Sequence, residues 1–367
     1  MDDMAKRAGD REAYPDSAFT FTGRWQEYFP IALTNFLLTV VTLGIYRFWA
    51  KARERRYLWS RTHFIDDHLE WTGTGKEMFI GFLMVFLILL PVILIIQYLV
   101  PALILRGEAL AAGLLVMGLY FGIFYLIGLA VFRALRYRLS RTYWHGIRGG
   151  SDDGGWSYGF QALWKTVVGF MVAGLLVPWS MTSLWNDRWN QMSFGQYQFE
   201  ANADIEGLFG RWLLVYLVPI GAFVVAMVAA VALAMGGGSA PGDPPGPGGA
   251  IAAVLGIILF YLAFLLASLS YYAAFYRQVA AATSVAGIQF EFTARTRHWL
   301  MLILGNIGLV IVTLGFGALF LGYRNWAFRI RHLEASGEIH LDTLLQSTTR
   351  APGEAEGLAD AFDIGAI

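Results

Sequence analysis

The fold of this chain is decided by one stretch, TNFLLTVVTLGIYRFWAKARERRYLWSRT, which runs from Thr34 to Thr62. Its first part is an apolar helix that we expect to break at Thr42-Leu43-Gly44, because glycine punctuates the helical pattern there. Its second part is basic and rich in aromatic residues. An apolar helix followed at once by such a segment is typical of a protein that lies partly in a membrane and partly at its surface.

The composition of the whole chain agrees with a membrane location. Of 367 residues, 57% are hydrophobic and only 15% are charged, whereas a soluble domain of this length needs far more charged surface. The sequence therefore predicts an α-helical polytopic membrane protein. It contains no cysteine, which excludes disulfides, thiolate metal sites and cysteine nucleophiles. Segment 1–16 is polar and has no apolar core, so we expect a cytosolic N-terminal tail and no signal peptide.

Seven apolar stretches stand out in the sequence. They are Pro30–Trp49, Met78–Leu105, Ala109–Phe132, Thr166–Trp185, Trp212–Met235, Ala250–Phe275 and Trp299–Gly322. The second, third, fifth and sixth are long enough to cross about 30 Å of hydrocarbon. The first, fourth and seventh are expected to be broken or re-entrant. No charged residue lies deep inside any of the seven. Lys165 lies at the start of the fourth stretch and Arg211 at the start of the fifth.

Short segments between these stretches alternate apolar and polar residues. Period-two alternation predicts half-buried strands, and open strand edges must lie outside the hydrocarbon. We therefore expect these strands on the cytosolic face, although short extended linkers remain an alternative. The alternating residues are Phe19 and Phe21, Leu69 and Trp71, Tyr197 and Phe199, and Ile288, Phe290 and Phe292.

The sequence also indicates an internal repeat. A shift of 271 residues aligns Phe19–Arg53 with Phe290–Arg324 without a gap, and it pairs Asn35 with Asn306 and the first Thr-Leu-Gly with a second. A second shift, of 141 residues, aligns Arg136, Thr142, Gly146 and Ile147 with Arg277, Thr283, Gly287 and Ile288. We interpret the chain as about two and a third copies of one unit. The predicted divisions are a polar tail (1–16), unit 1 (17–148), unit 2 (149–289), partial unit 3 (290–345) and a disordered tail (346–367).

Two membrane layouts fit this repeat. If all seven stretches cross, the copies are inverted and the cationic residues divide between the two faces. If only four cross, every Lys and Arg except Arg106 faces one side, and the outer loops are Arg106–Glu108 and the flexible Gly236–Gly249. The preference of Lys and Arg for cytoplasmic loops favours four crossings. The length of Trp299–Gly322 favours seven.

The basic segment Tyr46–Arg61 is predicted to be an interfacial helix. Its aromatic residues fall on one side, whereas Arg47, Lys51, Glu54 and Arg55 fall on the other. The simplest interpretation is topological anchoring, and the sharper one is a site for an anionic lipid or ligand. The expected anionic-lipid contacts are Arg47, Lys51, Arg53, Arg55, Arg56 and Arg61.

Polar residues in the broken helices form a second group of candidates. Asn35 and Asn306 occupy equivalent depths, where an amide needs a hydrogen-bond partner. They are expected either to fix helix packing, through each other or through the backbone, or to line a polar pathway. Carbonyl groups freed at the helix breaks offer ligands for a cation or substrate. These positions are Thr42 and Gly44 in the first copy and Thr313 and Gly315 in the second.

No combination of residues supports catalysis. His63, Asp66, Asp67 and His68 cluster in HFIDDH, but the cluster lacks a second arm for a metal, and we interpret it as a solvated turn. The sequence has no metalloprotease, nucleophile-elbow, phosphate-loop or dinucleotide motif. We therefore expect no enzyme activity, no cofactor and no nucleic-acid partner.

The run LLTVVTLGIYRFWAKARERRYLWSRTHF, together with the F-x-F-x-G-x-W opening at Phe19–Trp25, resembles the YjgN-like family of bacterial membrane proteins. The similarity extends through Thr72–Glu77. It weakens in the later copy, where Trp49-Ala50-Lys51 is replaced by Phe320-Leu321-Gly322. The resemblance implies a location in the bacterial inner membrane. It implies no activity, because the family is one of unknown function.

Two functional hypotheses follow. The first is a transport or permeation protein, which the repeat and the broken helices favour. Coupling to an ion gradient is not expected, because no ionisable residue lies inside a span. The second is a lipid-binding or membrane-organising scaffold that uses the basic segments. The partner is in either case the lipid bilayer, with anionic lipids favoured.

Overall fold

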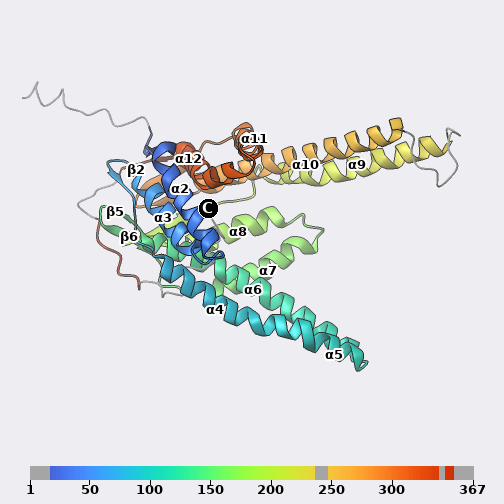
Figure 1. The fold of residues 1–367 in the computed structure, drawn as a ribbon, viewed down its shortest axis with the longest axis horizontal. Helices are drawn as coiled ribbons and strands as arrows, with labels where there is room; N and C mark the ends of the chain where they lie inside the picture. Colours follow the sequence, from blue (N-terminus) through green and yellow to red (C-terminus); the bar gives the residue numbers. More distant parts are fainter. Residues whose placement is uncertain (1–16, 236–246, 339–343, 351–367) are drawn as a thin grey trace, which may run out of the picture.

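A computed structural model of the chain describes residues 17–235, 247–338 and 344–350. The predicted N-terminal tail, most of the flexible loop at 236–249 and the tail from 351 onward lie outside the described residues. Helical hairpins extend from a layer of short strands (Figure 1). Two long hairpins diverge from that layer, and shorter hairpins lie around and between them (Figure 1).

The helices of the described residues pair into five hairpins. Two are long: α4 continues through η1 and α5 and returns as α6, and α9 returns as α10. Three are short, namely α2–α3, α7–α8 and α11–α12, the last of which includes η2. The bounds are α2 (Trp25–Val41), α3 (Arg47–Ser60), α4 (Gly75–Leu94), η1 (Ile95–Leu99), α5 (Val100–Leu105), α6 (Ala109–Arg141), α7 (Trp156–Met171), α8 (Val177–Trp189), α9 (Phe209–Met235), α10 (Pro247–Ala281), α11 (Thr296–Val312), η2 (Phe316–Phe320) and α12 (Leu321–His332).

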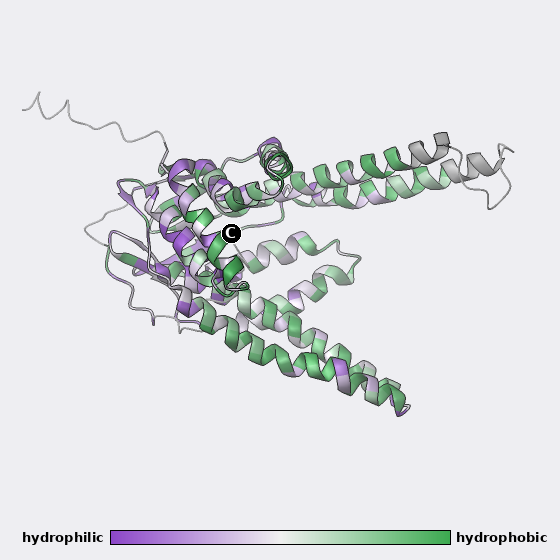
Figure 2. Ribbon diagram, viewed as in Figure 1, coloured by the Kyte–Doolittle hydropathy of each residue, from purple (hydrophilic) through white to green (hydrophobic). Residues whose placement is uncertain are grey.

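The long hairpins supply four helices that are long and apolar enough to cross a membrane, counted over the described residues. They are Gly75–Leu105, Ala109–Arg141, Phe209–Val228 and Val254–Ala281. Hydrophobic residues cover these hairpins along their length, and hydrophilic residues gather at the strand end (Figure 2). Most of the exposed side chains in these helices are apolar, which suits contact with lipid; Gln97 is an exception. The chain is therefore a polytopic, mainly helical membrane protein.

Each short hairpin reverses through a tight turn. Two consecutive residues in that turn have positive φ, which glycine adopts freely and other residues adopt at a cost. The pairs are Leu43 and Gly44 (51° and 93°), Ala173 and Gly174 (48° and 76°), and Leu314 and Gly315 (51° and 99°). The helix predicted to break at Thr42-Leu43-Gly44 does so, since α2 ends at Val41 and α3 begins at Arg47.

The strands are short and form hairpins between the helices. Four hairpins use two-residue turns, and the first turn residue, which is Ile65, His145, Gly195 or Ala286, has positive φ. Such turns match the natural twist of paired strands. The bounds are β1 (Phe19–Phe21), β2 (Thr62–Phe64), β3 (Asp67–His68), β4 (Glu70–Trp71), β5 (Thr142–Trp144), β6 (Ile147–Gly150), β7 (Ser193–Phe194), β8 (Tyr197–Ala201), β9 (Thr283–Val285), β10 (Ile288–Phe292) and β11 (Leu333–Ser336).

Eight of these strands, β4 to β11, form one antiparallel sheet in sequence order, and it curves into a half-barrel. A small three-stranded sheet, β1–β2–β3, packs against it. Phe19 and Phe64 of the small sheet share a core cluster with Trp144 and Ile288 of the half-barrel. This packing joins strands that lie far apart in the sequence. The alternating segments did predict β1, β4, β8 and β10, but β2, β3, β5, β6, β7, β9 and β11 were not predicted.

Two segment boundaries predicted from the sequence differ from those in the structure. Residues 346–350, predicted to belong to a disordered tail, are held against the β5–β6 hairpin: the Gln346 amide donates to Gly146 O (2.7 Å), and Arg148 N donates to Gln346 Oε1 (3.2 Å). Residues 247–249, predicted to lie in the flexible loop, are the first turn of α10. Polar side chains near a chain end find backbone partners there, which composition alone does not reveal.

Candidate functional site: a cationic central cavity

A cavity of 830 Å³ lies where the helical hairpins meet the strands. We call it the central cavity. Residues of α3, α6, α7, α8, α10, α11 and α12 line it. Five of the described lining residues are cationic and one is acidic, namely Lys51, Arg55, Arg138, Arg188, Arg329 and Glu54. The aromatic lining residues are Trp59, Tyr158, Trp185, Tyr272, Phe275, Tyr276, Trp299 and Trp326.

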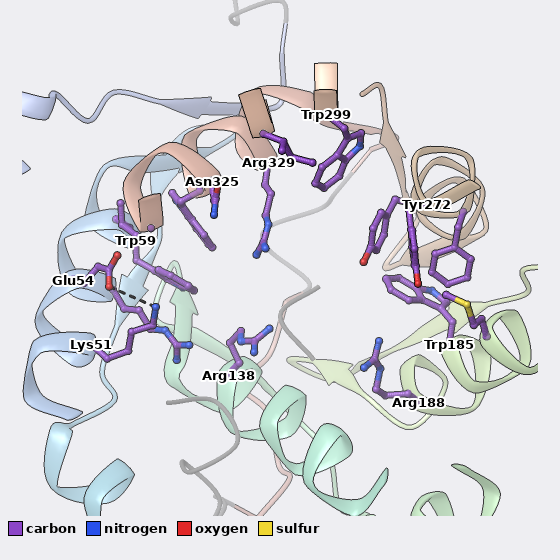
Figure 3. Close-up of a pocket in the computed structure, with 18 of the residues that line it drawn as sticks. Lys51, Glu54, Trp59, Arg138, Trp185, Arg188, Tyr272, Trp299, Asn325 and Arg329 are labelled. Atoms are coloured by element: carbon purple, nitrogen blue, oxygen red, sulfur yellow. Dashed lines mark hydrogen bonds and ion pairs between the residues drawn. The ribbon is translucent and has the colours of Figure 1, made fainter. Parts of the chain in front are cut away.

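The arginines converge from helices that are distant in sequence. Arg138 comes from α6, Arg188 from α8 and Arg329 from α12, and all three point into the same space (Figure 3). Lys51 lies at the edge of that space and forms an ion pair with Glu54 at 3.5 Å (Figure 3). The excess of cations gives the cavity a positive potential, which low-dielectric walls strengthen.

Three tryptophans fix the walls of the cavity. Each indole N–H donates to a threonine hydroxyl at the first residue of a strand, at 2.9–3.0 Å. The pairs are Trp59 with Thr142, Trp185 with Thr283, and Trp326 with Thr62. Each threonine hydroxyl in turn donates to the carbonyl four residues earlier, at the end of the preceding helix. Each short hairpin is thereby fastened to a strand that follows a different hairpin.

Stacking further orders the aromatic walls. Trp59 and Trp326 stack with their ring centroids 4.1 Å apart, which joins α3 to α12. The Arg188 guanidinium lies 5.4 Å from the Trp185 ring, within cation–π range. An arginine held over an indole keeps its planar donors in a fixed orientation, which suits a carboxylate or phosphate ligand.

A second cavity of 350 Å³, which we call the inner chamber, adjoins the central cavity. Six residues line both: Trp59, Arg138, Trp185, Tyr276, Trp326 and Arg329. The remaining wall of the inner chamber comes from strands and helix ends and is almost wholly apolar. It comprises Phe19, Leu69, Leu135, Leu139, Thr142, Trp189, Phe199, Ala280, Thr283, Phe290, Phe292, Ile330 and Leu333.

Asn35 and Asn306, the two asparagines predicted as site residues, each link the two helices of their own hairpin. Asn35 Nδ2 donates to Ala50 O at 3.1 Å, which links α2 to α3. Asn306 Nδ2 donates to Asn325 Oδ1 at 3.0 Å, which links α11 to α12. They do not bond to each other, so the interpretation as a mutual pair is wrong. Neither lines the central cavity.

The predicted break positions lie at the tips of the short hairpins, away from the central cavity. Thr42 Oγ1 accepts from Tyr46 N at 2.9 Å, and Thr313 Oγ1 accepts from Gly317 N at 2.6 Å. Gly44 and Gly315 supply the positive φ of the turn. These hydroxyls and glycines shape the reversal of the helix, and no ligand chemistry converges on them in the described residues.

The six basic residues predicted to contact lipid differ in their surroundings. Arg47, Arg53 and Arg56 are exposed. Arg61 pairs with Glu27 at 2.8 Å. Arg55 was predicted to face the polar side of its helix but is only 4% exposed, with its guanidinium 5.0 Å from the Trp71 ring. Helix α3 packs against α4 and β4 and also borders the cavity, so two of its faces are covered.

The HFIDDH cluster forms the β2–β3 hairpin. His145 Nε2 lies 2.9 Å from Asp66 Oδ1, which ties this hairpin to the β5–β6 turn. Burial raises the pKa of Asp67, but the backbone N–H of His68 and the adjacent His68 ring outweigh it and hold the pKa below its usual value. Within the described ranges, no group of His, Cys, Asp or Glu is arranged to hold a metal.

Sequence reasoning missed most of the cavity residues. One signal was available: α8 and α12 share a Trp-x-x-Arg pattern at Trp185–Arg188 and Trp326–Arg329. Sequence reasoning also placed Lys165 at the start of an apolar stretch. Lys165 in fact lies inside α7, is 6% exposed, and forms an ion pair with Asp187 of α8. A buried lysine is therefore paired with a half-buried aspartate between the helices of this hairpin.

Comparison with known proteins gives the chain its family. Residues 16–361 match the family described as bacterial protein of unknown function (DUF898). The chain is 31% identical over 153 residues to the inner membrane protein YjgN of Salmonella typhimurium, which covers 42% of this chain and 33% of that protein. It is 31% identical over 134 residues to YjgN of Escherichia coli O157:H7, covering 36% of this chain and 31% of that protein.

The aligned part spans about a third of the length of these two relatives. No solved structure matches the chain. The names of the relatives, together with the four apolar helices, identify a multi-pass protein of the bacterial inner membrane. Because the family match covers nearly the whole chain, the protein belongs to the DUF898, YjgN-like family of bacterial inner-membrane proteins.

Proposed function

We propose that this protein binds the anionic headgroup of a membrane amphiphile in its central cavity. The observation that carries the proposal is the convergence of five cationic side chains and one acidic side chain on a cavity with aromatic walls. Carboxylate and phosphate groups are the ligands that arginine holds best, through two parallel hydrogen bonds. The chain would then be a binding protein, and not an enzyme.

The position of the cavity favours an amphiphile over a water-soluble anion. Arg138, Arg188 and Arg329 line it from the last four residues of α6, α8 and α12, near the strands. Lys51 lines it nearer the tip of the α2–α3 hairpin, and Met181, Leu269 and Ile303 also line it further along the helices. A wall that combines charged and apolar residues matches a molecule with a charged head and a hydrocarbon chain. Tryptophan and tyrosine, which line the cavity, favour the headgroup depth of a membrane.

The membrane layout belongs to the same proposal. The three short hairpins enter the bilayer and return, while the strands and both tails face the cytosol. The tip residues Leu43 and Leu314 support this layout, because their side chains are 93% and 92% exposed, which favours contact with hydrocarbon over water. Each short hairpin also has the same kind of turn, which supports a duplicated unit. Exposed Arg47, Arg53 and Arg56 then lie at the cytosolic surface, outside the central cavity.

A binding experiment tests this proposal. The purified chain in neutral detergent is titrated with short-chain phosphatidylglycerol and, separately, phosphatidylcholine, while tryptophan fluorescence reports on the cavity walls. We expect the anionic lipid to bind more tightly. The double substitution Arg188→Gln, Arg329→Gln should weaken it about 30-fold, because each cation contributes on the order of 1 kcal/mol of attraction.

Two controls make the result specific to the cavity. Arg188→Lys, Arg329→Lys keeps both charges and should retain most of the affinity. Arg53→Gln, Arg56→Gln removes two exposed charges outside the cavity and should have little effect. Equal affinity for the two lipids, or equal losses in the cavity and surface variants, would contradict the proposal.

Passage of a small molecule without ion coupling is a second candidate. It is favoured by the adjacency of the two cavities, which share six lining residues between the helices and the strands. Proteoliposomes loaded with small anionic and neutral solutes test this candidate. Solute efflux that Arg188→Gln, Arg329→Gln alters would support passage, whereas leakage equal to that of protein-free liposomes would oppose it.

A further inference from the structure

The wall of the inner chamber is almost wholly apolar. Strands β1, β8 and β10 contribute Phe19, Phe199, Phe290 and Phe292 to its wall, and helix ends contribute leucine, isoleucine and alanine side chains. Its volume of 350 Å³ lies at the low end of the range for ligand sites in proteins. A wall of this composition favours an apolar ligand, because burying hydrocarbon from water is the main source of binding energy there.

Most polar groups in this wall are already satisfied or lie at the mouth; the exception among the described residues is Trp189 Nε1, which is buried without a hydrogen-bond partner. Thr142 and Thr283 accept from the indoles of Trp59 and Trp185 and donate to backbone carbonyls. Their hydroxyls therefore do not require a polar ligand. The charged groups of the wall are the guanidinium groups of Arg138 and Arg329, which also line the central cavity.

We propose that the inner chamber holds the hydrocarbon chain of a single-chain anionic amphiphile, whose headgroup lies between Arg138 and Arg329 at the mouth. This inference rests on the proposed function and specifies its ligand class. A fatty acid or an alkyl phosphate has this chemistry. A diacyl lipid does not suit the chamber, because two chains would have to pass a mouth formed by three tryptophans, a tyrosine and two arginines.

The chain of such a ligand would extend toward the strands and not toward the bilayer. This orientation separates the inference from ordinary lipid binding, in which the chains would remain along Met181, Leu269 and Ile303 of the central cavity. Affinity should then depend on chain length until the chamber is filled. The expected gain is about fourfold for each methylene taken from water.

A series of alkyl phosphates tests this dependence. The full chain in lipid nanodiscs is titrated with ethyl, hexyl, octyl and decyl phosphate, each below its micelle-forming concentration, and binding is corrected with empty nanodiscs. Ala280→Phe fills the chamber from α10. It should weaken decyl phosphate at least tenfold and leave ethyl phosphate unchanged. Ala281→Phe adds the same ring at the next, exposed position and should change neither.

A spectroscopic readout locates the chain without altering the chamber volume. Trp189 lines the inner chamber but not the central cavity, whereas Trp299 lines the central cavity but not the inner chamber. Decyl phosphate brominated at its terminal carbon quenches tryptophans that it touches. We expect Trp189→Phe to remove a component of the quenching and Trp299→Phe to preserve it.

The outcomes separate this inference from the proposed function. Quenching that is lost in Trp299→Phe and kept in Trp189→Phe overturns the inference, and so does undiminished decyl phosphate binding by a folded Ala280→Phe variant. In both cases a loss of affinity in Arg188→Gln, Arg329→Gln would leave the proposed function standing. If that double variant binds every member of the series normally, the proposed function fails as well.

Discussion

The two equivalent asparagines should respond differently to the same substitution. Asn306→Leu removes two hydrogen bonds: the amide donates to Asn325 Oδ1 at 3.0 Å, and Arg324 Nε donates to Asn306 Oδ1 at 2.7 Å. A neutral hydrogen bond contributes about 1 kcal/mol of net stability, and one to a charged group about 1.5–3 kcal/mol. We therefore expect Asn306→Leu to lower the free energy of unfolding by about 2–4 kcal/mol.

Asn35→Leu should leave the free energy of unfolding unchanged or raise it. It removes one bond, to Ala50 O, which costs about 1 kcal/mol. Ala50 lies inside α3, where its carbonyl also accepts a helical N–H. However, Asn35 Oδ1 is buried without a hydrogen-bond partner, and removing such an acceptor recovers about 1–3 kcal/mol. The expected change is therefore between about zero and a gain of about 2 kcal/mol.

Equilibrium unfolding measures this contrast directly. The purified chain is unfolded in mixed micelles with an increasing fraction of SDS, and tryptophan fluorescence gives the midpoint for each variant. Asn35→Leu should unfold at or above the wild-type midpoint and Asn306→Leu well below it. If Asn35→Leu loses as much stability as Asn306→Leu, the assignment of an unsatisfied acceptor to Asn35 is wrong.

Three further predictions use the same unfolding assay. Gly75→Ala places a Cβ 2.6 Å from a backbone atom of α3 and should cost about 1–3 kcal/mol, whereas Gly118→Ala has open space and should be neutral. Asp187→Leu should cost about 3–5 kcal/mol by leaving the buried Lys165 charge unpaired, and adding Lys165→Met should recover most of that loss. The folded-state pKa of Asp67 is lowered, so its contribution to stability should be complete above its usual pKa of 3.8 and be lost as pH falls below it. Asp67→Asn should flatten the pH dependence of the midpoint in that acidic range; an unchanged slope would contradict the assignment.

The long-range parts of the architecture were the least predictable from the sequence. The length of the apolar stretches predicted the four long helices, and the glycine of Thr42-Leu43-Gly44 predicted the break after Val41, because both are local properties of the chain. Strands β5 and β9 were missed because three residues carry too little alternation to stand out. Their hairpins are formed instead by turn residues with positive φ, such as His145 and Ala286, whose identities give little sequence signal.

The candidate site was predictable only in part. The basic segment of α3 was identified, and Lys51 and Arg55 of that segment do line the central cavity. The direction in which Arg55 points was predicted wrongly because a helical wheel assumes one buried side. In the structure one side of α3 packs against α4 and another borders the central cavity. Arg138, Arg188 and Arg329 were not recognised, since they approach one another only after three separate hairpins have packed.

The bond from the Trp326 indole to Thr62 has a consequence for biogenesis. It joins the last helical hairpin to the strand that follows the first, and Tyr323 adds a second link to Gly23 O at 2.7 Å. During synthesis the ribosome must therefore release the chain through α12 before this seam forms. The central cavity, whose wall includes Asn325, Trp326 and Arg329 of α12, is complete only after that point.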